Sequence, residues 1–166
     1  MYNYLNTIQT PLAPIEKYDW QQMHEWVYHE MGKRLTTDNI IDVGCGCGLL
    51  GAFLIHYNYC KHVVMYETDE VYLNYARALV ETMGLTAQIE ILPIFYTSAP
   101  KLQNTTIVAT RLGPLTEFEK IIGNNRAMTI RRTEEVEPYF IRESTKVWHG
   151  EIIKRPDGFE LEVLTR

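Results

Sequence analysis

The sequence has little cysteine, and its three cysteines, Cys45, Cys47 and Cys60, are an odd number. Two of them lie in a glycine-rich loop, which argues against a disulfide framework and favours a reducing compartment, so we expect a cytoplasmic protein. Basic residues are also scarce, because 16 Lys and Arg against 21 Asp and Glu give a net charge of -5. A general electrostatic attachment to nucleic acid is therefore not expected, although a local basic patch is compatible with this balance.

Long apolar stretches are absent as well. No run reaches the roughly 18 residues that cross a bilayer, and the first ten residues lack a basic segment followed by an apolar one. We therefore expect neither a membrane span nor a secretory signal. Apolar residues make up 46% of the chain and charged residues 22%, which is typical of a packed globular protein and argues against disorder, collagen or a coiled coil.

Short apolar runs alternate with helical patterns along most of the 166 residues, a length that suits one domain. Residues 1–17 have prolines and no periodicity, so we interpret them as an N-terminal arm and residues 18–166 as the domain. Apolar spacing and capping residues predict helices, and β-branched runs predict strands. The predicted helices cover 18–35, 49–57, 69–83 (with Thr68 as N-cap) and 115–122, and the predicted strands cover 39–43, 62–66, 88–92, 105–110 and 127–131.

The C-terminal part of the chain carries turn residues between two alternating runs. Pro156-Asp157-Gly158 separates residues 147–154 from residues 159–165, which predicts a β-hairpin. Strands that alternate with helices predict a parallel sheet covered on both faces. The expected fold is a single-domain α/β three-layer sandwich, with a mostly parallel seven-stranded sheet and a C-terminal antiparallel hairpin.

Residues 42–51, DVGCGCGLLG, join the first expected strand to the helix after it. Glycines at alternate positions let backbone pass where a Cβ would collide with a ligand, and the helix N-terminus offers free N–H groups. Such a loop lies where open α/β sheets bind their ligands. The letters GCGLLG also fit the dinucleotide pattern G-x-G-x-x-G, so a nucleotide-cofactor oxidoreductase is one candidate.

Asp42 distinguishes between ligands for this loop. A buried carboxylate is costly unless it meets a cationic or hydrogen-bonding partner. A diphosphate gains nothing from a carboxylate so near, whereas a ligand with an ammonium group does. Asp42 therefore favours a cationic ligand over a dinucleotide, with capping of the loop as its structural alternative.

The loop from Asp42 to Gly48 resembles the first motif of class I S-adenosylmethionine-dependent methyltransferases, and Glu67, at the end of the second strand, matches the family's ribose-binding acid. The resemblance implies S-adenosyl-L-methionine as cofactor. Asp42 would bind the amino group through water or backbone, and Glu67 would hold both ribose hydroxyls. The other implied contacts are Gly44, Cys45, Gly46 and Gly48 along the methionine and ribose, Thr68 beside the adenine, and packing by Ile94 or Phe95. Without a cofactor, the loop would be a structural tight turn and Glu67 a solvated strand end.

The segment after the fourth strand bears on the methyl acceptor. Thr110-Arg111-Leu112-Gly113-Pro114 stands where many nucleic-acid amino methyltransferases carry Asn or Asp, two prolines and an aromatic residue, so adenine-N6 and cytosine-N4 chemistry is not expected. A strand-4 arginine before a Leu-rich helix is weakly similar to bacterial ribosomal-RNA guanine-N7 methyltransferases. Arg111 is therefore the candidate for substrate binding, and RNA is a candidate acceptor. A surface ion pair is the alternative for Arg111.

No catalytic residue stands out, because a sulfonium already makes its methyl group electrophilic and the protein mainly aligns a nucleophile. No metal is expected, since the helix between Cys47 and Cys60 is too long for its two ends to share an ion. The sequence thus predicts direct transfer of the methyl group to a nucleophile of unknown class. The alternatives are the oxidoreductase and a catalytically inactive cofactor-binding or interaction module with the same fold.

Overall fold

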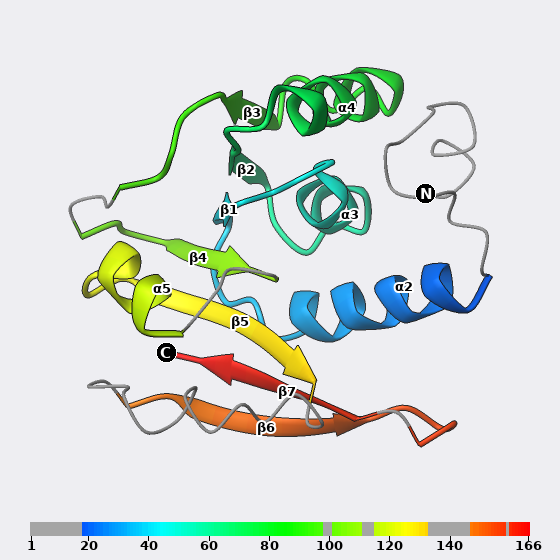
Figure 1. Ribbon diagram of the computed structural model, residues 1–166, viewed down its shortest axis with the longest axis vertical. Coiled ribbons are helices and arrows are strands. Elements are labelled where there is room, and N and C mark those ends of the chain that lie inside the picture. The colour runs from blue at the N-terminus through cyan, green and yellow to red at the C-terminus, as the bar shows by residue number, and fades with distance from the viewer. Residues whose placement is uncertain (1–17, 98–100, 111–114, 133–146, 159) are drawn as a thin grey trace.

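The computed structural model describes residues 18–97, 101–110, 115–132, 147–158 and 160–166 (Figure 1). The predicted arm and Arg111 lie outside these residues, and none of the described helices is both long and apolar enough to cross a membrane. The helices are α2 (Tyr18–Gly32), α3 (Leu49–His56), α4 (Glu70–Thr82) and α5 (Leu115–Ile122). The strands are β1 (Asn39–Val43), β2 (His62–Tyr66), β3 (Ile89–Leu92), β4 (Thr105–Ala109), β5 (Arg126–Arg132), β6 (His149–Lys154) and β7 (Glu160–Thr165).

All seven strands form one sheet in the order β3-β2-β1-β4-β5-β7-β6. The neighbouring pairs β3–β2, β2–β1, β1–β4 and β4–β5 are parallel, and β7 runs antiparallel to both β5 and β6. This arrangement confirms the predicted α/β sheet with its C-terminal hairpin. The chain moves outward from β1 to β3 and then returns to the other side of β1 at β4. The carboxyl ends of β1 and β4 therefore mark the switch point where open sheets bind ligands.

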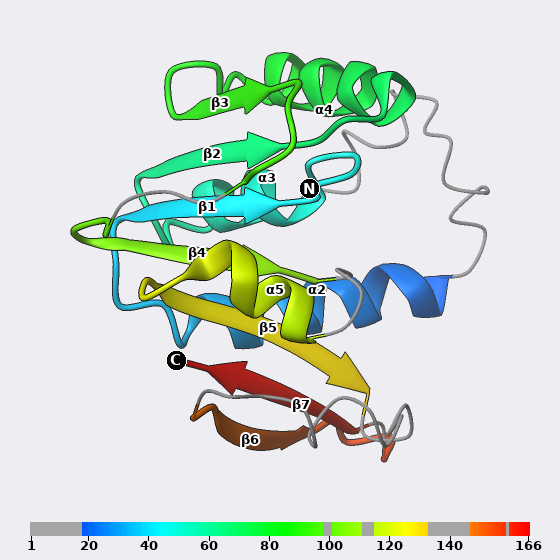
Figure 2. The same ribbon diagram turned by 60° about the vertical axis from the view of Figure 1, so that its left-hand side comes forward.

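The two faces of the sheet are covered unequally (Figure 2). Side chains from α2, α3 and α4 pack with Ile40, Val63 and Met65 in the larger core. On the opposite face, α5 contributes Phe118 and Ile122 to a smaller core. Alternate residues of β1 and β2 enter the two cores, because successive side chains of a strand point to opposite faces.

Most predicted bounds are confirmed to within two residues, and the differences have local causes. Helix α2 ends at Gly32 rather than at Leu35, because the chain tightens there: the N–H of Arg34 donates to the carbonyl of Met31 and that of Leu35 to Gly32. The predicted N-cap Thr68 is wrong, since Asp69 is the residue whose carboxylate accepts from the first turn of α4. At the other end of α4, Gly84 adopts a φ of 68°, which terminates the helix as predicted.

Candidate cofactor site

The glycine-rich loop crosses from β1 toward the end of β2. The N–H groups of Gly44 and Cys45 both donate to the carbonyl of Tyr66, at 2.9 and 3.1 Å, and the N–H of Gly48 donates to the carbonyl of Cys45 at 3.0 Å. Gly44, Gly46 and Gly48 have φ values of 68°, 54° and 76°, which residues with a Cβ rarely adopt. The loop thus depends on glycine for its backbone path.

The glycines of the loop serve different neighbours. A Cβ at Gly46 would meet nothing within 4 Å, so this part of the loop is open. A Cβ at Gly48 would lie 3.1 Å from both the Ala76 Cβ and the Met65 Sδ. Gly48 therefore permits α3 to pack closely against α4 and β2, and this packing accounts for the glycine independently of any ligand.

Asp42 occupies a buried position beneath α3. It is 2% exposed, and its Oδ2 atom has no hydrogen-bond partner among the described residues. Burial raises the pKa of Asp42 to about 7; the backbone amide of Gly51 opposes this effect and the charge of Glu67 adds to it. A buried carboxylate oxygen without a partner is costly, and a cationic group that reached it would remove that cost.

Glu67 follows β2 and ties two loops together. Its Oε2 accepts a hydrogen bond from the N–H of Gly46 at 3.0 Å, and its Oε1 accepts from Thr68 at 2.7 Å and from Asp69 at 3.0 Å. The carboxylate therefore joins the open part of the glycine loop to the start of α4. A carboxylate offers about four acceptor positions, so one position, on Oε2, remains for a ligand hydroxyl.

The other predicted cofactor contacts lie at the same edge of the sheet. Thr68 is exposed next to Glu67, and Ile94 and Phe95, just after β3, are 53% and 60% exposed. Apolar side chains with that much free surface, beside the ends of β2 and β3, fit the flat face of a nucleobase. Contact of these residues with an adenine stays a prediction.

The cysteines of the loop are held as neutral thiols. Burial raises the pKa of Cys45 well above its usual range, and the charges of Asp42 and Glu67 raise it further. Burial also raises the pKa of Cys47 to about 11, again with a contribution from Glu67. Thiols are weak nucleophiles and weak metal ligands compared with thiolates. Within the described ranges, no group of three or more potential metal ligands comes together.

Two features of the site were missed from the sequence. One is the set of three backbone amides on Glu67, and the other is the Tyr66 carbonyl that receives the first two amides of the loop. Both depend on how far β2 extends beside β1. The pairing of Val43 with Tyr66 sets that register, and no pattern in the sequence reports it.

The chain matches one family model and no curated protein. The model, described as the methyltransferase small domain, matches residues 26–108, from within α2 into β4, which is half of the chain. The matched part contains Asp42, the glycine loop and Glu67. No curated protein matches the sequence.

Solved structures share the fold at low sequence identity. TrmK from M. capricolum, in complex with S-adenosyl-homocysteine, has a TM-score of 0.61 and 17% identity over 84% of this chain and 66% of its own. The m1A22 tRNA methyltransferase TrmK from B. subtilis has a TM-score of 0.60 and 15% identity, over 83% of this chain and 63% of its own. An rRNA methylase from Streptococcus thermophilus has a TM-score of 0.57 and 14% identity, over 85% of this chain and 93% of its own.

These likenesses show the fold, and the chain spans less than two thirds of the length of either TrmK. The family match carries more weight, because it covers the motif residues themselves. S-adenosylmethionine is the cofactor that this family implies. The chain belongs to the methyltransferase small domain family, whose fold and motifs are those of class I S-adenosylmethionine-dependent methyltransferases.

Proposed function

We propose that this chain binds S-adenosylmethionine at the glycine loop and transfers its methyl group to a nucleophile. The observation that carries the proposal is the pair of carboxylates on neighbouring strands, Asp42 on β1 and Glu67 after β2, on either side of an open glycine backbone. The pair suits a ligand with an ammonium group at one end and a ribose at the other. The family match supports this interpretation over a dinucleotide oxidoreductase.

The residues present fit the cofactor in four respects. The partnerless Oδ2 of Asp42 supplies an acceptor toward the amino group, and the remaining acceptor position of Glu67 is available to the ribose. Gly44, Cys45, Gly46 and Gly48 present backbone between these two groups. Thr68 and Ile94 lie beside the expected place of the adenine.

When bound, the cofactor supplies a methyl group on a positively charged sulfur, which is already electrophilic. The protein has to orient this group and keep competing nucleophiles away from it. Burial contributes to the second task, because it keeps Cys45 and Cys47 protonated beside the site and so protects them from methylation. The loop carboxylates orient the cofactor by its two ends.

We propose RNA as the class of methyl acceptor. Support comes from fold relatives described as tRNA and rRNA methyltransferases. Arg111, which follows β4 by two residues, is the proposed substrate-binding residue, because the carboxyl end of β4 adjoins the loop at the switch point. An unprotonated ring nitrogen of a nucleobase has a free lone pair, so methylation at such an atom needs no dedicated general base.

We place the reaction in the cytoplasm, where RNA acceptors and a reducing environment coincide. Cys45, Cys47 and Cys60 are all free thiols in the structure. Thiols persist in reducing compartments and form disulfides in oxidising ones.

Two measurements test the proposed function. Calorimetric titration with S-adenosylhomocysteine should give saturable binding, and titration with NAD should give none. Incubation of the protein with methyl-labelled cofactor and separate RNA and protein fractions should label RNA. Absence of binding overturns the cofactor assignment, binding without any transfer leaves an inactive cofactor-binding module, and label in protein alone overturns RNA as the acceptor.

A further inference from the structure

Asp42 lies among apolar side chains, and the backbone amide of Gly51 is the polar group that stabilises its charge. In the sheet it pairs in register with Met65 of β2 and Val108 of β4. Above it lies α3, where a Cβ added to Gly51 would be 3.7 Å from the Asp42 Oδ2. None of these neighbours carries a charge.

The titratable group that acts on Asp42 is Glu67, which repels its negative charge. No cation pairs with Asp42 among the described residues. Glu67 differs from Asp42 because three backbone amides stabilise its charge. Burial without a cationic partner therefore favours the protonated form of Asp42 when no ligand is present.

We propose that Asp42 gives up this proton to solvent when the ammonium group of the cofactor binds, so that cofactor affinity is linked to pH. The inference rests on the proposed cofactor site and goes beyond it. In the ligand-free protein near pH 6, Asp42 is mostly a neutral acid. In the complex, the O–H bond of Asp42 breaks, the proton goes to solvent or buffer, and the carboxylate faces the ligand's ammonium, so the pocket gains one negative charge with one positive charge.

The size of the effect follows from linkage. Since burial raises the pKa of Asp42 to about 7, about 0.9 proton should be released per ligand near pH 6 and about 0.2 near pH 7.5. The dissociation constant should accordingly be about eightfold larger near pH 6 than near pH 7.5, which means weaker binding at the lower pH. Only ligands that carry the ammonium group should show this dependence.

Isothermal titration of the full chain with S-adenosylhomocysteine tests the inference. At about pH 6, the binding heat is measured in two buffers of different ionisation enthalpy. The difference between the two heats, divided by the difference between the two ionisation enthalpies, gives the number of protons released. 5′-Methylthioadenosine, which keeps the nucleoside and sulfur but lacks the ammonium group, is the matched ligand. Asp38→Asn is the matched variant, because Asp38 is a half-buried carboxylate just before β1 that pairs with Lys61.

Proton release close to one with S-adenosylhomocysteine supports the inference, provided that the same ligand releases none from Asp42→Asn. The Asp38→Asn protein should behave as wild type, and 5′-methylthioadenosine should release no proton. Tight binding of S-adenosylhomocysteine without proton release overturns the inference and leaves the proposed function intact. Equal release with 5′-methylthioadenosine also overturns it, and absence of binding overturns both. If Asp42→Asn does not fold, the comparison of the two ligands on wild-type protein still decides.

Discussion

Replacement of Glu67 by Gln should weaken cofactor binding while leaving the fold in place. In the ligand-free protein the two carboxylate oxygens accept backbone N–H groups from both sides: Gly46 on one, Thr68 and Asp69 on the other. A Gln side chain keeps one acceptor oxygen and turns an NH₂ group toward the other set of donors. The variant therefore loses at least one amide contact in addition to its charge.

The magnitude follows from these contacts. Hydrogen bonds to a charged group contribute about 1.5–3 kcal/mol, and a ribose hydroxyl on Glu67 would be one of them. We expect the dissociation constant of S-adenosylhomocysteine to rise by roughly 10- to 100-fold, or about 1.4–2.8 kcal/mol. Stability should fall by only about 1 kcal/mol, because Thr68 and Asp69 are exposed and water can replace the lost acceptor.

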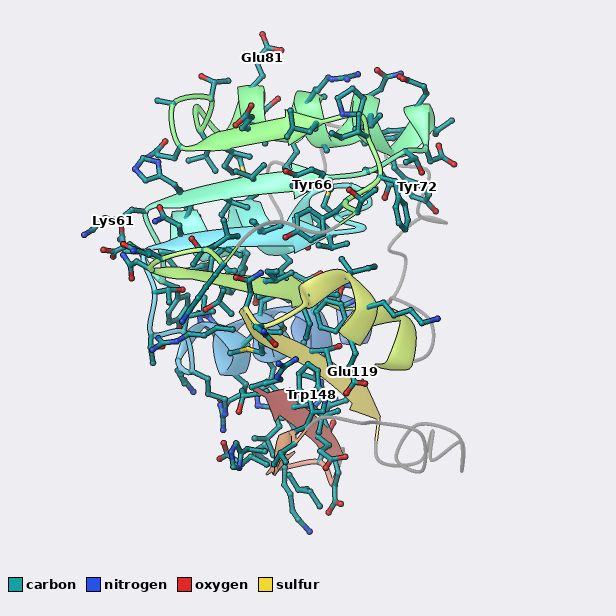
Figure 3. All side chains as sticks on the ribbon, turned by 90° about the vertical axis from the view of Figure 1, so that its left-hand side faces the viewer. Lys61, Tyr66, Tyr72, Glu81, Glu119 and Trp148 are labelled. Atoms are coloured by element: carbon teal, nitrogen blue, oxygen red, sulfur yellow. The ribbon has the colours of Figure 1, made fainter. Side chains whose placement is uncertain are left out.

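Calorimetric titration and thermal unfolding of the same protein samples measure both quantities. Glu81→Gln is the matched control, because Glu81 lies on α4 but points to solvent at the outer end of that helix (Figure 3). The control should bind as wild type does. If Glu67→Gln binds S-adenosylhomocysteine with unchanged affinity, Glu67 does not contact the ribose and the site assignment is wrong.

Three further predictions concern the stability of the ligand-free protein. The pKa of Asp42 in the folded protein, about 7, lies above its ordinary value of 3.8, so stability is lost as the pH rises and the buried carboxyl ionises. In urea unfolding, the free energy of unfolding should fall by about 3 kcal/mol from about pH 5 to about pH 8. Asp42→Asn should remove this pH dependence. Gly48→Ala combines a positive φ with crowding, and in urea unfolding it should lower the free energy of unfolding by about 2–4 kcal/mol. Gly46→Ala has the positive φ without the crowding and should lower it by about 1–2 kcal/mol. Equal losses of stability would contradict the packing role of Gly48. Trp148→Phe removes the indole N–H that donates to the Glu119 Oε1 at 2.7 Å, a hydrogen bond that joins the segment before β6 to α5 (Figure 3). The melting temperature should fall by a few degrees, equivalent to about 1–2 kcal/mol of stability.

The sequence predicts the sheet well because its signals are local. The run at 39–43 is bounded by a glycine loop, and the run at 62–66 ends in Glu67, so both strands are placed to the residue. The turn at 156–158 likewise predicts the hairpin. Patterns of this kind need no knowledge of distant contacts.

The errors arise where neighbouring residues compete for one role. Thr68 and Asp69 are both good N-caps, and the structure selects Asp69, whose carboxylate accepts from Val71 at 2.8 Å and Tyr72 at 3.4 Å. The N–H of Thr68 donates instead to Glu67, which places Thr68 outside the helix.

The sequence names candidate residues for the site, but it does not show the contacts that hold their side chains. Asp42 and Glu67 can be identified from their positions beside the glycines. That one of them is buried without a cation, while the other is held by three amides, depends on the register of β1 against β2. This difference gives the two carboxylates separate roles in the account.

A crystal structure of the protein in complex with S-adenosylhomocysteine would show where the ligand binds. The ligand should lie along the open side of Gly46, with a ribose hydroxyl at the remaining acceptor position of Glu67 and the ammonium group directed to the Oδ2 of Asp42. Density for the nucleoside at another edge of the sheet, or with its ribose away from Glu67, would contradict the account.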